Sequence, residues 1–257
     1  MAQSSLGSSG TIAGTSLAVA VTNFKQKHED SLLGILWYLL EPLFVFAVLL
    51  LIRKALDIQT PFYPLYLFLG LIMFNFFAHT TGAAARSLLS NGGLIAWINI
   101  RLEIFPLAVV IQHLFSHLFE VLILIGVVLW VGAPIQSILF YPIALLPLIF
   151  FTLGISMALS ILTVIMRDIG NVWRVVIGRV VWLATPIFYT VSEGTQLYAL
   201  NQWNPLYHFM EFGRSLLVYG RIPELHSFLI TYLVGILSLL GGWLIFRSLK
   251  HRAPELL

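Results

Sequence analysis

Long apolar runs separated by short polar breaks dominate this chain. The first boundary lies at 25–42, where charged residues give way to an apolar run that continues through Leu51. A helix that crosses a bilayer needs about 20 mostly apolar residues. The runs predict an all-α integral membrane protein with six transmembrane helices, at about 35–52, 62–81, 104–131, 138–166, 172–190 and 228–246.

Two breaks are not plain loops. Residues 86–100 mix polar and apolar side chains, which favours a short amphipathic helix at the membrane interface. Residues 191–226 are too polar, and too interrupted by Gly and Pro, to span. We expect short re-entrant helices there, because non-helical backbone at membrane depth must be surrounded by protein or water.

The N-terminal region precedes the first span. Residues 1–15 are rich in Ser, Gly and Ala and predict a flexible tail. Residues 16–30 carry apolar positions at helical spacing beside basic residues, which predicts an amphipathic interfacial helix. An unstructured polar linker is the alternative for 16–30. Residues 16–257 are expected to form a single transmembrane domain.

Composition and charge placement support a multi-pass protein with a defined orientation. Charged residues make up 10% of the chain and apolar residues 59%, whereas soluble domains have about 25% charged residues. With the N-terminus inside and six crossings, ten Lys and Arg residues fall inside and four outside. Cytoplasmic loops carry such an excess, so both termini are expected in the cytoplasm.

Several kinds of chemistry are excluded by the sequence. There is no cysteine, which rules out disulfides, thiolate metal sites and thiol nucleophiles. No Gly-x-x-x-x-Gly-Lys-Ser/Thr motif occurs, so the chain has no phosphate-cradling loop of this type. If ATP drives this protein, we expect the nucleotide on another chain.

The strongest candidate for metal chemistry is a polar stripe on the third span. His113, His117 and Glu120 share one helix face at offsets of four and three, and such a set could bind zinc in a membrane-embedded enzyme. Alternatively, the stripe faces a neighbouring helix or a wet cavity, with His and Glu hydrogen-bonded to each other. We favour the second interpretation and expect neither a metal site nor a catalytic residue.

Other intramembrane charges also need partners. Glu41 lies about a turn into the first apolar run, where a carboxylate must be paired, protonated or wet. Arg167 and Asp168 are adjacent and cannot pair ideally on a helix, so each is expected to contact a helix end, a loop or a lipid phosphate. Glu211 and Arg214 could form a structural clip or line an exit.

The order of five short motifs resembles that of one known family, the membrane (permease) subunits of type-two ABC exporters of lipid-linked polysaccharide. This family moves O-antigen, capsule and teichoic-acid polymers. The resemblance covers nearly the whole chain after the tail. It is carried by Ser31–Trp37 with Glu41-Pro42, Ile100–Pro106, Arg167–Ile169, Thr185–Tyr189 and Asn204–His208.

The resemblance implies partners and a mechanism. It implies a homodimer in the bacterial cytoplasmic (inner) membrane, with a channel between subunits for an undecaprenyl-diphosphate-linked glycan. Two copies of a separate ATPase, which hold ATP and Mg, are expected on the cytoplasmic face; no cofactor on this chain and no nucleic-acid partner is expected. A coupling helix is implied at 86–100 and an outer gate at 191–226.

Three sets of site residues follow from these expectations. Aromatic rings can stack on sugars or merely face lipid, and basic residues attract lipid phosphates. The expected channel and mouth residues are Trp37, Glu41, Phe44, Phe77, Arg101, Arg167, Arg174 and Tyr189. The expected ATPase-coupling residues are Arg86, Ser90, Asn91, Leu94, Trp97 and Asn99. The expected outer-gate residues are Asn204, Pro205, Tyr207, His208, Glu211 and Arg214.

Other functions fit parts of the same pattern. A type-two ABC permease for a drug or a small lipid would share the architecture and differ in cargo. The metal-dependent enzyme would use the polar stripe of the third span, and a passive scaffold would need none of these sites.

Overall fold

The computed structural model describes residues 11–29, 37–55, 60–97 and 100–256, and this part of the chain is helical with no strand. The helices are α1 Ile12–Glu29, α2 Trp37–Ala55, α3 Tyr63–Ser90, α4 Gly92–Trp97, α5 Ile104–Val131, η2 Ile135–Phe140, α6 Tyr141–Ile165, α7 Asp168–Val175, η3 Val176–Val181, α8 Trp182–Ala184, α9 Gln196–Asn201, α10 Pro205–Leu217, α11 Leu225–Leu249, η4 Lys250–Arg252 and α12 Ala253–Leu256.

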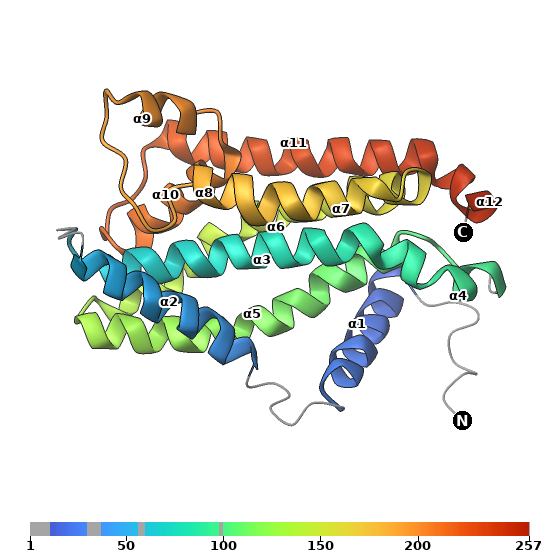
Figure 1. Ribbon diagram of the computed structural model, residues 1–257, viewed down its shortest axis with the longest axis horizontal. Coiled ribbons are helices and arrows are strands. Elements are labelled where there is room, and N and C mark those ends of the chain that lie inside the picture. Colours follow the sequence, from blue (N-terminus) through green and yellow to red (C-terminus); the bar gives the residue numbers. More distant parts are fainter. Residues whose placement is uncertain (1–10, 30–36, 56–59, 98–99, 257) are drawn as a thin grey trace.

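Four of these helical segments are long and apolar enough to cross a membrane. They are α3, α5, the continuous segment Ile135–Ile165, and the segment Leu225–Arg252 that begins with α11. They run lengthwise beside one another (Figure 1). The expectation of an all-α membrane protein is confirmed at this level.

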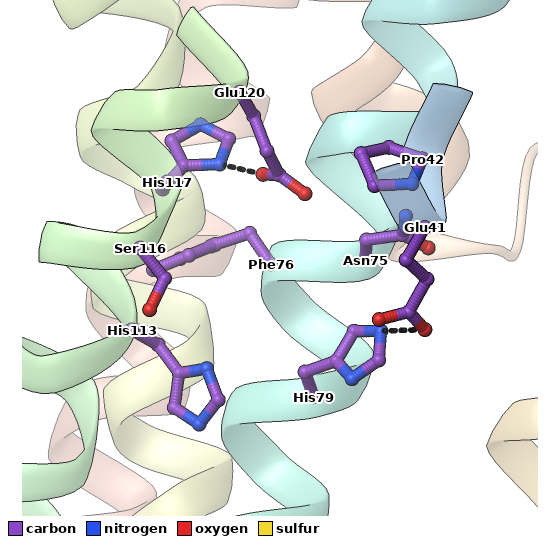
Figure 2. Close-up of a pocket in the computed structure, with 9 residues that line it drawn as sticks. All are labelled: Glu41, Pro42, Asn75, Phe76, His79, His113, Ser116, His117 and Glu120. Atoms are coloured by element: carbon purple, nitrogen blue, oxygen red, sulfur yellow. Dashed lines mark hydrogen bonds and ion pairs between the residues drawn. The ribbon is translucent and has the colours of Figure 1, made fainter. Parts of the chain in front are cut away.

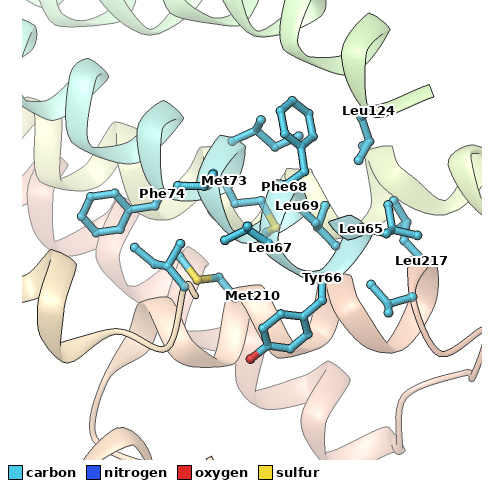
Figure 3. Packing of buried hydrophobic residues seen from close by; sticks show 14 of the residues in the cluster. Leu65, Tyr66, Leu67, Phe68, Leu69, Met73, Phe74, Leu124, Met210 and Leu217 are labelled. Atoms are coloured by element: carbon cyan, nitrogen blue, oxygen red, sulfur yellow. The ribbon is translucent and has the colours of Figure 1, made fainter. Parts of the chain in front are cut away.

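Helix α3 is the centre of the bundle. It packs against α5 and α6 and also contacts α2, α7 and α10. Its apolar side chains are buried almost continuously from Leu65 to Phe74, beside Leu124 of α5 and Met210 and Leu217 of α10 (Figure 3). Burial on all sides of this stretch explains why it is apolar throughout and why its aromatic residues form core rather than surface.

The backbones of helices α6 and α11 lie in close contact. A Cβ atom added to Gly154 would lie 2.1 Å from the carbonyl oxygen of Ser238. A Cβ atom added to Gly242 would lie 1.9 Å from the carbonyl oxygen of Gly154. Small residues permit such contact between membrane helices, where close packing rather than hydrophobic burial drives association.

Several helices begin or end at residues other than those expected from the sequence. The second expected span, 62–81, continues to Ser90, because Thr81 is buried and satisfied: its hydroxyl donates to the carbonyl of Phe77 and accepts from the indole N–H of Trp173. The fifth expected span begins at Asp168 and stops at Ala184, because Pro186 places Thr185 in an extended conformation.

Helix α1 begins at Ile12, four residues before the expected start of the interfacial helix and inside the expected tail; residues 1–10 lie outside the described part. Its buried face packs on α5. The ring of Phe24 lies 6.2 Å from that of Phe115 and 6.5 Å from that of Phe119. An aromatic contact with the bundle therefore positions α1.

An ion pair joins the start of α5 to the end of the last long helix. Lys250 Nζ lies 2.7 Å from Glu103 Oε1. Burial by itself would raise the pKa of the Glu103 carboxyl. The hydrogen bond from Lys250, a backbone hydrogen bond and the charges of Lys250 and Arg101 outweigh burial and hold this pKa below its ordinary value.

We expect Glu103→Gln to lower the free energy of unfolding by about 1 kcal/mol near neutral pH, because both partners remain partly solvated. The pKa of Glu103 is lower in the folded protein than in the unfolded chain, where it is about 4.3. The ion pair therefore stabilises the fold at any pH above the unfolded-state pKa, and this stabilisation is lost as the pH falls through the folded-state pKa. Thermal unfolding of both proteins between about pH 3 and pH 7 tests this. A difference between them that persists at the acid end would contradict it.

Candidate functional site

Basic side chains gather at one end of the bundle. The C-terminal ends of α3 and α11 and the N-terminal ends of α5 and α7 meet there, near α4 and α12 (Figure 1). These ends carry Arg86, Arg101, Arg167, Arg174, Arg247, Lys250 and Arg252. The opposite end holds α9, α10 and the start of α3. The two ends of the helices are therefore electrostatically unequal, as membrane-protein orientation requires.

A polar cavity of about 70 Å³ lies between α2, α3 and α5. Figure 2 shows side chains from the three helices converging on it. Glu41 of α2 lines the cavity and is 3.8 Å from His79 Nε2 of α3. The remaining lining residues are Pro42, Asn75, Phe76, His113, Ser116, His117 and Glu120. Glu41 therefore has a potential ionic partner and lies at a cavity with a polar lining.

The polar stripe of α5 is hydrogen-bonded within the fold. His117 is buried; its Nδ1 contacts Glu120 Oε2, and its Nε2 lies 2.6 Å from the hydroxyl of Tyr141. With both ring nitrogens in these contacts, His117 offers a lone pair to a metal only by giving up a hydrogen bond. The geometry therefore matches the interpretation in which His and Glu satisfy each other.

The expected aromatic channel residues do not come together. Trp37 and Phe44 are exposed on α2, whereas Phe77 is buried between the rings of Phe151 and Trp173. Phe77 is therefore part of the core of one subunit in this conformation and presents no ring face to a channel. Tyr189 is half-buried, and its hydroxyl hydrogen-bonds to the carbonyl oxygens at the end of α8.

The expected coupling segment contains α4 as a short helix at the basic end. Ser90 and Asn91 terminate α3: the hydroxyl of Ser90 donates to the carbonyl of Arg86, and the amide of Asn91 donates to that of Ser87. The side chain of Leu94 is exposed and that of Trp97 is 90% exposed. Asn99 lies outside the described residues. An exposed Trp at the basic end is a surface suited to protein contact.

One arginine of the expected basic mouth and one of the expected coupling segment hydrogen-bond to the same side chain, Asn171, which the sequence did not single out. Arg86 of α3 and Arg174 of α7 both donate to Oδ1 of Asn171, each at 3.2 Å. Arg101 and Arg167 are exposed at the starts of α5 and α7. No pattern in the sequence pointed to Asn171, because its partners come from two helices.

At the opposite end, three side chains hold the segment Thr185–Tyr189; we call Tyr63, Tyr66 and Arg214 the clasp. Arg214 is fully buried, with Nη2 2.8 Å from the carbonyl oxygen of Pro186 and 3.1 Å from that of Ile187. Its guanidinium lies 3.5 Å from the ring centroid of Tyr66. The tyrosine hydroxyls donate to the carbonyls of Phe188 and Tyr189.

The expected pair of Glu211 and Arg214 forms a structural clip. Arg214 Nη1 lies 2.9 Å from Glu211 Oε1, and burial of the guanidinium is incompatible with lining an open exit. Gly70 provides the space, since a Cβ atom there would lie 2.7 Å from Arg214 Nη2. The sequence offered one indication of the clasp. A tyrosine in an apolar run needs a hydrogen-bond partner for its hydroxyl when it is buried, and Tyr63 and Tyr66 lie in the second apolar run.

The other expected gate residues shape the entry to α10. Asn204 caps it, accepting from the backbone N–H of Leu206 and donating to the hydroxyl of Thr185 at 2.9 Å. Pro205 occupies the first helical position. His208 donates to the carbonyl of Gln202 at 2.8 Å, and its ring packs against that of Tyr207. These contacts bind the two short helices to the clasped segment.

The chain is similar to known proteins along nearly its whole length. The chain is 27% and 26% identical to two proteins from Klebsiella pneumoniae and 21% identical to one from Myxococcus xanthus, each described as an O-antigen export system permease protein RfbA. Each match covers 94% of this chain and 95% of the relative. No protein-family model matches.

These similarities confirm the resemblance to the membrane subunits of type-two ABC exporters. Together with the apolar helices, they indicate a multi-pass membrane protein that is similar to permeases of O-antigen export systems.

Proposed function

We propose that this chain is the transmembrane subunit of an ATP-driven exporter that moves an undecaprenyl-diphosphate-linked polysaccharide across the bacterial cytoplasmic membrane. The observation that carries the proposal is the similarity to O-antigen export permeases over 94% of the chain. The arrangement of the helices supports the proposed crossings, and the resemblance to the exporter family supports the proposed partners.

The proposed subunit has six crossings. Helix α2 and the segment from α7 to α8 join the four long segments; they contain 19 and 17 residues, which at 1.5 Å per residue approaches the thickness of the hydrocarbon core. The end that carries α4 and most of the basic side chains faces the cytoplasm with both termini. Helices α9 and α10 act as the outer gate, and α1 lies at the inner interface.

The proposed transport cycle uses force from a separate chain. Two copies of an ATPase, which carry ATP and Mg, dock on the cytoplasmic face of a homodimer and contact α4. Basic side chains at that end attract the lipid diphosphate. ATP-dependent movement of α4 opens a passage between the subunits for the glycan, and exposed rings such as Trp37 and Phe44 are candidates to line it. Coupling requires that the two conformations bind nucleotide differently.

An export assay tests the proposal. In a bacterium that lacks its O-antigen permease, we expect this chain and its ATPase to restore polysaccharide at the cell surface, while Trp97→Ala reduces export at least fivefold. Loss of a central interface Trp commonly weakens binding by about 2 kcal/mol or more. Surface polysaccharide and co-purified ATPase are measured together.

Trp203→Ala is the matched control, because Trp203 is 89% exposed at the opposite end of the bundle. It should leave the amount of co-purified ATPase unchanged. The exporter assignment fails if the chain moves drugs or small lipids but no glycan, or if it transports without an ATPase. Equal loss of ATPase from both variants would refute the role of α4.

A further inference from the structure

Two exposed arginines converge on one neutral oxygen at the basic end of the bundle. Since Arg86 Nη2 and Arg174 Nη2 each lie 3.2 Å from Asn171 Oδ1, the two nitrogens are separated by no more than twice that distance. Neither arginine is ion-paired with a carboxylate in the described ranges. Two like charges are thus held close together, with only an amide dipole between them.

The backbone around this cluster is fixed by close packing of α3 against α7. The indole N–H of Trp173 donates to the Thr81 hydroxyl at 3.0 Å. A Cβ atom on Gly170 would lie 3.1 Å from the side chain of Thr163 and 3.8 Å from that of Ala85. The positions from which Arg86 and Arg174 extend are therefore set before any ligand arrives, which reduces the entropy lost on binding.

The arrangement matches the chemistry of a phosphate ester. Guanidinium groups donate paired N–H bonds to phosphate oxygens, and each of these two has further N–H donors besides the one that it gives to Asn171 Oδ1. An anion between the two arginines would also remove their mutual repulsion, which a neutral oxygen relieves only in part. A carboxylate-rich or neutral ligand would use this set of donors less completely.

We propose that Arg86, Asn171 and Arg174 form a binding site for the phosphate group of a membrane-anchored lipid. The diphosphate of the carried polyprenyl lipid and the headgroup of an anionic phospholipid share this chemistry, and the first of these rests on the function proposed above. The site gives Arg86 a direct part in ligand binding, in addition to its place beside the coupling helix.

The test is binding of radiolabelled undecaprenyl diphosphate to the full-length protein in nanodiscs of phosphatidylcholine. Arg86→Gln and Arg174→Gln should each weaken binding about tenfold, or about 1.4 kcal/mol. Asn171→Asp should weaken it at least as much, because the new carboxylate would pair with both arginines and repel the diphosphate. Arg86→Lys should recover part of the loss, since it keeps the charge without the fork.

Arg252→Gln is the matched control, because it removes an exposed charge from the same end of the protein and lies outside the expected mouth. It should change binding by less than about twofold, whereas a loss equal to that of Arg86→Gln would show diffuse charge attraction and overturn the site. Gel filtration and thermal unfolding of each variant separate loss of binding from loss of folding.

A second arm replaces part of the phosphatidylcholine with phosphatidylglycerol. If phosphatidylglycerol displaces the diphosphate from the wild-type protein but not from Arg86→Gln, the site takes either source of phosphate. If only phosphatidylglycerol binding depends on Arg86 and Arg174, the site is a phospholipid headgroup site, and the diphosphate assignment fails. If neither lipid depends on them, the proposed site is wrong, while the export assay still decides the exporter function independently.

Discussion

Gly242→Ala should remove most of the folded protein from membranes, because it forces α6 and α11 apart. The added Cβ atom would lie 1.9 Å from the carbonyl oxygen of Gly154 and 2.5 Å from its carbonyl carbon. These are backbone atoms, so no side-chain rotation relieves the contact. Overpacking usually lowers the free energy of unfolding by about 1–3 kcal/mol. A clash between two helix backbones should lower it by at least about 3 kcal/mol. The measurement is thermal unfolding followed by fluorescence-detected gel filtration.

The neighbouring glycine provides the control. A Cβ atom on Gly241 would meet no atom within 4 Å. Gly241→Ala should therefore be neutral or slightly stabilising, because alanine favours a helix over glycine by up to about 1 kcal/mol. If the two alanine variants unfold at the same temperature, the close contact between α6 and α11 does not exist in the membrane.

Arg214→Met should be the most damaging change at the end of the bundle that holds α9 and α10. It should lower the free energy of unfolding by about 3–5 kcal/mol, the usual cost of removing one partner of a buried ion pair. Methionine keeps much of the side-chain length but donates no hydrogen bond. The carbonyls of Pro186 and Ile187 and the carboxylate of Glu211 then lose their donors. Thermal unfolding measures the loss of stability.

Two further variants distinguish the loss of the clasp contacts from the loss of a charge alone. Glu211→Gln should cost less than Arg214→Met, because Glu211 is partly exposed while Arg214 keeps its two carbonyls and the ring of Tyr66. Arg221→Met removes an exposed charge at the same end and should leave stability unchanged. If Arg214→Met unfolds at the wild-type temperature, the clasp contributes nothing to stability.

Much of the helical order could be predicted because it depends on local composition. The span expected at 104–131 coincides with α5, because Pro106 lies in the first turn, where a helix tolerates proline, and Gly132 ends the helix in the left-handed conformation. The irregular segments 86–100 and 191–226 were recognisable by mixed polarity and by breakers. In the second of these, the expected short helices occur as α9 and α10.

Boundaries and partners were less predictable where polar groups are satisfied by distant helices. The polar run after Phe77 suggested the end of a helix, yet α3 continues because Trp173 binds the hydroxyl of Thr81. The ring of Phe77 was expected to line a channel, with a lipid-facing position as the alternative, whereas packing against α6 and α7 places it in the core. Arg86 and Arg174 were assigned to different roles, although they meet at Asn171.

The amino-acid sequence by itself determined the apolar spans, the short irregular segments between them, the imbalance of basic residues and the likeness to exporter permeases. Each of these depends on the identity and order of neighbouring residues. Only the tertiary structure decided that Arg214 closes the clasp, that His117 is saturated by Glu120 and Tyr141, and that two arginines share one amide. A polar group in a bilayer must be satisfied, but any helix that folds against it can supply the partner.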